Sequence, residues 1–318
     1  MTRTRVVAAV LLGLALSAPS FAGDNYALVV TGASSGEPYA AKYAAWRQSF
    51  VSTLRSKFGY PEDHVIVMAE HPAVGIRAAT SDEVRRTLLD LRGRLTKEDQ
   101  LVVLLIGHGT TTESDDAKFN LVGPDLKASE WAGLLKPFTS RIVFVDTTAV
   151  SFPFLRQLAA PGRIVITATD SSAQEFETVF GELFVRAFED ASGDADKSGR
   201  VSLFEAFVFA SAATRAWYDQ RGQLPTERPL IDDDGDGVGH EAWNPGSDGA
   251  LARATFLQPL PVPADAVAAA VVKRHRELES QIEELKRRRA SMPPAAYDAE
   301  LELLLVELAR LSAQGRQP

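Results

Sequence analysis

Cysteine is absent from all 318 residues of the sequence. This absence excludes a disulfide framework, a thiol nucleophile and thiolate metal ligands. Positive charge is also scarce, because 34 Lys and Arg stand against 42 Asp and Glu, for a formal net charge of −8. An acidic surface repels nucleic acid and anionic lipid, so neither is an expected partner.

Long apolar runs are missing too, apart from one short segment near the start. Arg3 and Arg5 precede an apolar run at 6–16, and Ser20-Phe21-Ala22 places small residues where a signal peptidase cleaves. The pattern is typical of a secretory signal, so we expect residues 1–22 to be removed and Gly23 to start the mature chain. The alternative is a retained anchor, but the run is about half of the ~20 residues that span a bilayer. We therefore expect an exported protein, periplasmic or extracellular, without a membrane span after cleavage.

What the sequence does contain is enough apolar material for a large core, since 45% of its residues are hydrophobic. Several short runs are apolar on both faces, and helical patterns separate them. Such strands predict an α/β fold with a mostly parallel sheet and helices on both faces. The predicted strands are 26–31, 64–69, 101–106, 141–145 and 163–168. The predicted helices are 39–57, 81–95 with Ser81 as its N-cap, 129–135, 178–190 and 202–221.

The composition changes after residue 257. Residues 258–263 carry prolines and are interpreted as a linker between a main domain at 23–257 and a helical region at 264–318. Pro293-Pro294 divides that region into two helices with coiled-coil-like spacing, so we expect a helical hairpin. Its seams can pack on each other, on the main domain, or on a second copy as a homo-oligomer. The seam residues are Val271, His275, Leu278, Ile282 and Leu285, then Tyr297, Leu301, Leu304, Leu308 and Leu311.

Two neighbouring strand ends carry chemically active side chains. The strand at 101–106 runs into Gly107-His108-Gly109, and the strand at 141–145 runs into Asp146-Thr147-Thr148, followed by Ser151. In a parallel sheet the ligand site lies beyond the carboxyl ends of the strands, near a topological switch point. A histidine on one strand and a hydroxyl on the next predict a candidate catalytic dyad.

This arrangement resembles the caspase–legumain clan of cysteine peptidases, over residues 26–222. The resemblance implies that His108 stands at the family's histidine. It places the family's cysteine at Thr148 by distance from the strand, or at Ala149 if the small pair after the cysteine is aligned with Ser151-Phe152. The cysteine is absent under either alignment.

The sequence also resembles a group of secreted bacterial proteins within this clan that carry a Thr-Thr pair at this point. Three further segments carry that likeness: Pro161-Gly162-Arg163, Ala168-Thr169-Asp170 and Glu177–Gly181. The resemblance implies an inactive peptidase homologue.

Three functions are consistent with the sequence. A hydroxyl is a much weaker acid than a thiol and needs a base held in line by a third group. The first hypothesis is therefore a non-catalytic module that binds a peptide or protein partner at the old substrate groove. The second is a hydrolase using His108 with Thr148 or Ser151, with Asp146 or Asp170 as the orienting acid. The third is a structural protein stabilised by calcium.

An Asp-rich loop at 194–205 has the pattern of a twelve-residue calcium loop. The expected ligands are Asp194, Asp196, Ser198, the carbonyl of Arg200, and Glu205 as the closing bidentate carboxylate. Gly199 supplies the sharp turn at position six. We expect structural Ca²⁺ here.

A second run, 232–237, has the carboxylate spacing of the first half of such a loop. Asp232, Asp234 and Asp236 are the expected ligands, and Glu241 can close a shorter loop because Trp243 stands at position twelve. The alternative for both loops is a polar turn without metal.

Overall fold

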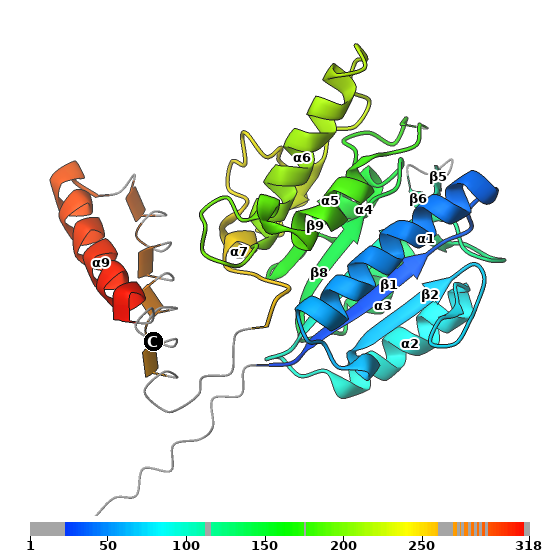
Figure 1. Ribbon diagram of the computed structural model, residues 1–318, viewed down its shortest axis with the longest axis horizontal. Helices are drawn as coiled ribbons and strands as arrows, with labels where there is room; N and C mark the ends of the chain where they lie inside the picture. Colours follow the sequence, from blue (N-terminus) through cyan, green and yellow to red (C-terminus); the bar gives the residue numbers. More distant parts are fainter. Residues whose placement is uncertain are drawn as a thin grey trace, which may run out of the picture.

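The computed structural model describes residues 23–111, 116–174, 176–259 and 292–314, with part of 270–289 between them. The expected signal segment at 1–22, residues 260–263 of the linker and His275 lie outside the described residues. Over the described part the fold class expected from the sequence is confirmed: α/β, with a mostly parallel sheet and helices on both faces (Figure 1).

The main sheet has seven strands in the order β10-β9-β8-β4-β1-β2-β3. All neighbours pair in parallel except β10 with β9. The chain moves outward from β1 first to β2 and β3, then returns to β4 on the other side, so the topological switch point lies between β1 and β4. The strands are β1 (Asn25–Thr31), β2 (Val65–Ala69), β3 (Arg77–Ala78), β4 (Gln100–Ile106), β8 (Arg141–Asp146), β9 (Arg163–Thr167) and β10 (Leu230–Asp232).

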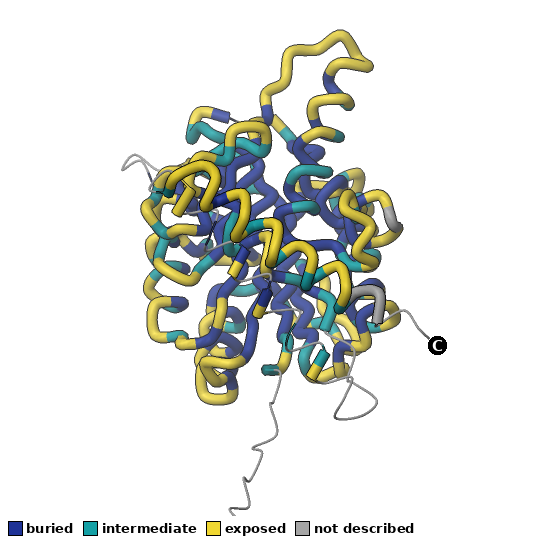
Figure 2. The backbone as a smooth tube through the Cα atoms, turned by 90° about the vertical axis from the view of Figure 1, so that its left-hand side faces the viewer, coloured by how far each residue is buried: buried dark blue, intermediate teal, exposed yellow. Residues whose placement is uncertain are grey.

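Helices cover the sheet on both sides because consecutive strand residues point to opposite faces. In β1, Ala27 and Val29 pack on one core and Leu28 and Val30 on the other. The first core contains side chains of α1 (Glu37–Ser52), α5 (Phe180–Glu189) and α6 (Leu203–Asp219). The second contains side chains of α2 (Ser81–Arg94), α3 (Ala128–Leu135) and α4 (Phe152–Leu158). Figure 2 shows this buried interior enclosed by exposed helix surfaces.

The structure departs from the sequence-based elements in a few places. The N-cap of α2 is Thr80 rather than Ser81, because the Thr80 hydroxyl accepts the N–H of Glu83 at 3.3 Å. The sequence did not predict α4, β3 or β10, which are too short to show a period. It also missed a small antiparallel sheet of β5 (Gly109–Thr111), β6 (Ala117–Phe119) and β7 (Leu126–Lys127).

The C-terminal region contains α9 (Pro294–Gln314), as expected. The helix before it is described in part, and Leu278, Ile282 and Leu285 of its predicted seam are buried. Arg274 pairs with Glu307 at 2.7 Å and Arg288 with Glu300 at 3.4 Å, which joins the two helices as a hairpin.

Among the described residues, no helix combines the length and the apolar character needed to cross a membrane.

Candidate functional site

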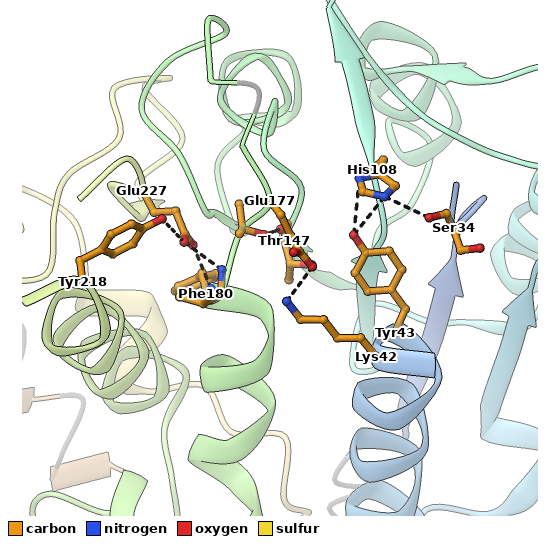
Figure 3. Close-up of polar contacts among 11 residues, drawn as sticks. Ser34, Lys42, Tyr43, His108, Thr147, Glu177, Phe180, Tyr218 and Glu227 are labelled. Carbon is orange, nitrogen blue, oxygen red and sulfur yellow. Dashed lines mark hydrogen bonds and ion pairs between the residues drawn. The ribbon is translucent and has the colours of Figure 1, made fainter. Parts of the chain in front are cut away.

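The carboxyl ends of β1, β4 and β8 form the candidate site. Ser34 follows β1, His108 follows β4, and Thr147 and Thr148 follow β8. Tyr43 of α1 packs over the same edge (Figure 3). The sheet order makes these strands neighbours, so His108 at the end of β4 lies beside the switch point between β1 and β4, and the threonines lie one strand further from it.

His108 leaves β4 through a backbone that requires glycine on both sides. Gly107 has φ of 151°, in a region that L side chains rarely adopt. A Cβ on Gly109 would lie 2.3 Å from Cγ2 of Val150 and 3.1 Å from Oγ1 of Thr148. The flanking glycines therefore let the histidine loop approach the β8 loop closely.

The His108 ring is held by groups from β1 and α1. Its Nε2 lies 3.2 Å from the backbone carbonyl of Ser34, and the Tyr43 hydroxyl lies 3.4 Å from Nε2 and 3.5 Å from Nδ1. Tyr39 approaches the ring edge-on, with centroids 4.9 Å apart. Burial, with the nearby Glu177 carboxylate, raises the pKa of Tyr43, so its phenol stays protonated. Two tyrosines of α1 therefore contact the imidazole that follows β4.

Neither threonine expected at the nucleophile position forms a side-chain hydrogen bond with the His108 ring within the described part of the chain. The Thr147 hydroxyl donates to the carbonyl of Leu105 at 2.8 Å, within the core. Thr148 is fully buried, and its Oγ1 makes no hydrogen bond to a described residue. Its backbone N–H donates to Oδ1 of Asp146 at 2.9 Å. The contacts of His108 described above involve neither threonine; Figure 3 shows Thr147 apart from the ring's hydrogen-bond partners.

Ser151 has a structural role in the turn after β8. It is fully buried, and its Oγ accepts the backbone N–H groups of Ala168 at 3.0 Å and Thr169 at 3.2 Å. The Thr169 hydroxyl lies 3.1 Å from the same oxygen and donates to the carbonyl of Ala149. These bonds tie the ends of β8 and β9 together.

The two candidate orienting acids are far from equivalent. Asp146 is fully buried, and burial raises its pKa to about 7. Its Oδ2 makes no hydrogen bond within the described part of the chain. Asp170 instead lies toward the surface and pairs with Arg228 at 3.4 Å. Neither carboxylate is among the partners of the His108 ring given above.

Several polar residues at this edge of the sheet were not predicted from the sequence. Glu70, directly after β2, accepts the Ser34 hydroxyl at 2.5 Å and the Ser34 N–H at 3.0 Å, and the hydroxyl bond holds the pKa of Glu70 below its usual value. Lys42 pairs with Glu177 at 2.6 Å. Glu70 was detectable as a polar residue at a strand end. The Lys42–Glu177 pair was not, because 135 residues separate its members.

A buried carboxylate holds the start of α5. Glu227 accepts the backbone N–H groups of Val179 at 2.8 Å and Phe180 at 2.9 Å, and the Tyr218 hydroxyl at 2.8 Å (Figure 3). A negative group at a helix N-terminus is favourable, although burial raises the pKa of Glu227. This contact fixes the loop that carries Glu177.

The structure brings the first Asp-rich loop together as expected. Carboxylate oxygens of Asp194, Asp196 and Glu205 lie within 4.8 Å of one another. The Ser198 hydroxyl lies 3.0 Å from the Arg200 carbonyl, and Asp194 accepts the N–H groups of Ser198 and Gly199. Glu205 also forms a capping box with Ser202 at the start of α6. All of these groups offer oxygen, the ligand atom that calcium prefers.

The second Asp-rich loop has a different membership from the expected one. Asp232 and Asp234 are brought together with Asp248, again within 4.8 Å. Asp236 instead caps the N–H of Val238, and Glu241 lies outside the cluster. The sequence did not predict Asp248 as a ligand, because it lies sixteen residues after Asp232, in a loop without regular structure.

Asp248 also binds His240, whose Nδ1 lies 2.6 Å from its Oδ2. Burial raises the pKa of Asp248 to about 6 and also raises that of Asp232. Closely packed carboxylates of this kind repel one another, and a cation would relieve the repulsion.

Comparisons with known proteins give similarity of structure without similarity of sequence. No protein-family model matches the chain, and no curated protein does either. A crystal structure of a Geobacter sulfurreducens protein, a structural genomics target, is 15% identical with a TM-score of 0.46, covering 75% of this chain and 100% of that one. A crystal structure of caspase-1 from Spodoptera frugiperda is 9% identical with a TM-score of 0.44, covering 67% and 87%. Both TM-scores are below 0.5, so the fold described above rests on this chain's own sheet order.

Proposed function

We propose that this chain is an exported, non-catalytic homologue of the caspase–legumain peptidases that binds a peptide or protein segment at the edge around His108. The sequence supports this by placing His108 at the family's histidine while lacking any cysteine. Export rests on the signal-like segment at 1–22.

One observation supports the proposed absence of catalysis. Thr147, Thr148 and Ser151 are all buried, and the hydroxyls of Thr147 and Ser151 are engaged in bonds that hold the sheet edge together. A serine or threonine nucleophile needs its base in hydrogen-bond contact. His108 instead contacts the Ser34 carbonyl and the Tyr43 hydroxyl.

Binding is supported by the groups that surround the histidine. Tyr39 is partly exposed beside the His108 ring and offers an aromatic side chain with a polar tip, a type common in recognition surfaces, whereas Tyr43 is buried and supports the ring from within. The imidazole and the Lys42–Glu177 pair add hydrogen-bonding groups beside them. An extended peptide lying across this edge would meet Tyr39, the imidazole and the Lys42–Glu177 pair.

Calcium is part of the same proposal, as a structural ion. Asp194, Asp196 and Glu205 would hold it, with the Arg200 carbonyl and Ser198 beside them. The ion would supply charge neutralisation to three adjacent carboxylates. The loop residues themselves connect α5 to α6, so holding this loop would support the helices that cover one face of the sheet.

The test is hydrolysis and capture of a mixed peptide library by the chain from Gly23, in calcium. We expect no cleavage, and retention of a subset of peptides that His108→Ala or Tyr39→Ala weakens. His64→Ala is the matched control, because His64 lies at the opposite end of β2 and stacks on Tyr26. Cleavage that disappears in His108→Ala would overturn the proposal in favour of a hydroxyl-nucleophile hydrolase. If neither variant changes peptide capture, the peptides bind somewhere other than this edge, and the proposed binding site is wrong.

A further inference from the structure

The outer side of α9 carries an apolar stripe that the hairpin leaves open. Leu301, Leu305, Val306 and Ala309 line a shallow hollow together with Asp298 and Glu302. Their spacing by three and four residues puts them on one side of the helix. Leu305 is 46% exposed and Val306 is 42% exposed, which is unusual for aliphatic side chains grouped in one stripe.

The partner helix within the hairpin covers a different side of α9. Tyr297, at the start of α9, is buried and stacks under Arg289. Glu300 and Glu307 pair with Arg288 and Arg274 of the preceding helix. The two-helix hairpin therefore buries one side of α9 and leaves the stripe beside it uncovered. Figure 1 shows α9 beside that helix and away from the sheet.

The charges beside the stripe indicate what covers it. Asp298 and Glu302 border the hollow, and no ion pair joins either of them to another described residue. The preceding segment carries a net opposite charge, with seven Lys and Arg against four Glu between 273 and 289. Within one hairpin, arginines of that helix form ion pairs with Glu300 and Glu307, on the side of α9 away from the stripe. A second hairpin would offer the same basic helix to Asp298 and Glu302.

We propose that the stripe is a self-association surface, where α9 of one chain packs against the hairpin of a second copy to form a two-fold four-helix bundle. Acidic α9 then lies between two basic helices, its own and its partner's. Such an isologous contact buries each stripe once per chain and closes on itself. The alternatives, docking on the chain's own sheet domain or on a foreign protein, are outcomes of the test.

The experiment compares two identical substitutions on the same helix. Leu305→Glu puts a charge in the stripe. Leu303→Glu is the control, because Leu303 is 72% exposed and lies about 160° around the helix from Leu305. The full chain from Gly23 is studied by sedimentation equilibrium and light scattering over a concentration series, with circular dichroism to check that both variants keep their helix content.

We expect twice the monomer mass for the wild type and for Leu303→Glu. Leu305→Glu should associate at least about a hundredfold more weakly, because a two-fold interface contains the substitution twice. A monomeric wild type at all concentrations would overturn the proposal. So would equal weakening by both variants, which would mean that the stripe has no special part in association. A monomer in which only Leu305→Glu lowers the unfolding temperature would assign the stripe to the chain's own sheet domain.

Discussion

Asp146 offers the sharpest test of the candidate site, because a fully buried carboxyl that forms no ion pair with the described residues should make stability fall as pH rises. Its pKa is raised from 3.8 to about 7 by burial, so the folded protein holds a proton there that the unfolded chain releases. When folding raises the pKa of a carboxyl group, the folded protein is most stable below the unfolded pKa. Its free energy of unfolding then falls as pH rises from about 4 to about 7. Replacing Asp146 with Asn removes the titration and keeps an oxygen to accept the Thr148 N–H.

The size of the effect follows from the two pKa values. A difference of about three pKa units corresponds to about 4 kcal/mol, since each unit is worth 1.36 kcal/mol. We therefore expect Asp146→Asn and wild type to unfold with similar free energies near pH 4. Near pH 8 the variant should be the more stable by up to about 4 kcal/mol. Other buried acids titrate equally in both proteins, so the difference between them isolates Asp146.

The assay is urea unfolding of both proteins at pH 4, 6 and 8 in calcium. Asp63→Asn is the control, because Asp63 is paired with Arg94 but its side chain is 71% exposed. A constant difference between Asp146→Asn and wild type across this range would refute the reasoning. It would mean that the Asp146 carboxylate is charged at neutral pH and stabilised by a group that burial alone does not reveal.

Three further predictions test other parts of the structure. Ser151→Ala should lower the free energy of unfolding by about 1–3 kcal/mol, because two buried N–H groups lose their acceptor. The control is Ser56→Ala, at an exposed position, which should change the free energy of unfolding little. Equal effects of the two substitutions in urea unfolding would contradict this prediction. Gly109→Ala should lower the free energy of unfolding by about 1–3 kcal/mol, because the added Cβ overlaps Val150. The control is Gly133→Ala, which should not destabilise, because an added Cβ there meets nothing within 4 Å. Calcium at 100 times its Kd should add about 2.7 kcal/mol of stability, and Glu205→Gln, which retains a capping-box residue, should lose most of the resulting rise in Tm. A calcium response that survives this substitution would move the ion away from the first loop.

Sequence reasoning reached the main sheet because parallel strands are apolar on both faces and end in recognisable turns. The five strands it placed are all present, and His108 and the threonines do follow neighbouring strands. It missed β3 and β10, which have two and three residues, and the small sheet after His108, whose strands have two or three. Such short segments carry no period to detect. The N-cap of α2 differed by one residue because Thr80 and Ser81 are both good caps, and the backbone conformation decides between them.

For the candidate site, proximity along the sheet could be predicted, but side-chain direction could not. The strand ends brought His108 to the same edge as Thr147 and Thr148. Only the packing showed that Thr147 turns to the Leu105 carbonyl and that Ser151 binds the start of the loop after β9. Such choices depend on neighbours that lie tens of residues away in the sequence.

The sequence by itself determined the absence of a thiol, the α/β class and the oxygen-rich character of the two Asp-rich loops. These follow from residue type and local period, which need no knowledge of distant contacts. The tertiary structure alone decided that Asp248 joins Asp232 and Asp234, that Glu70 binds Ser34, and that Asp146 is buried with no ion pair to another described residue. The physical reason is the same in each case: burial and long-range contact set the direction and the pKa of a polar side chain, and both arise only when the chain is folded.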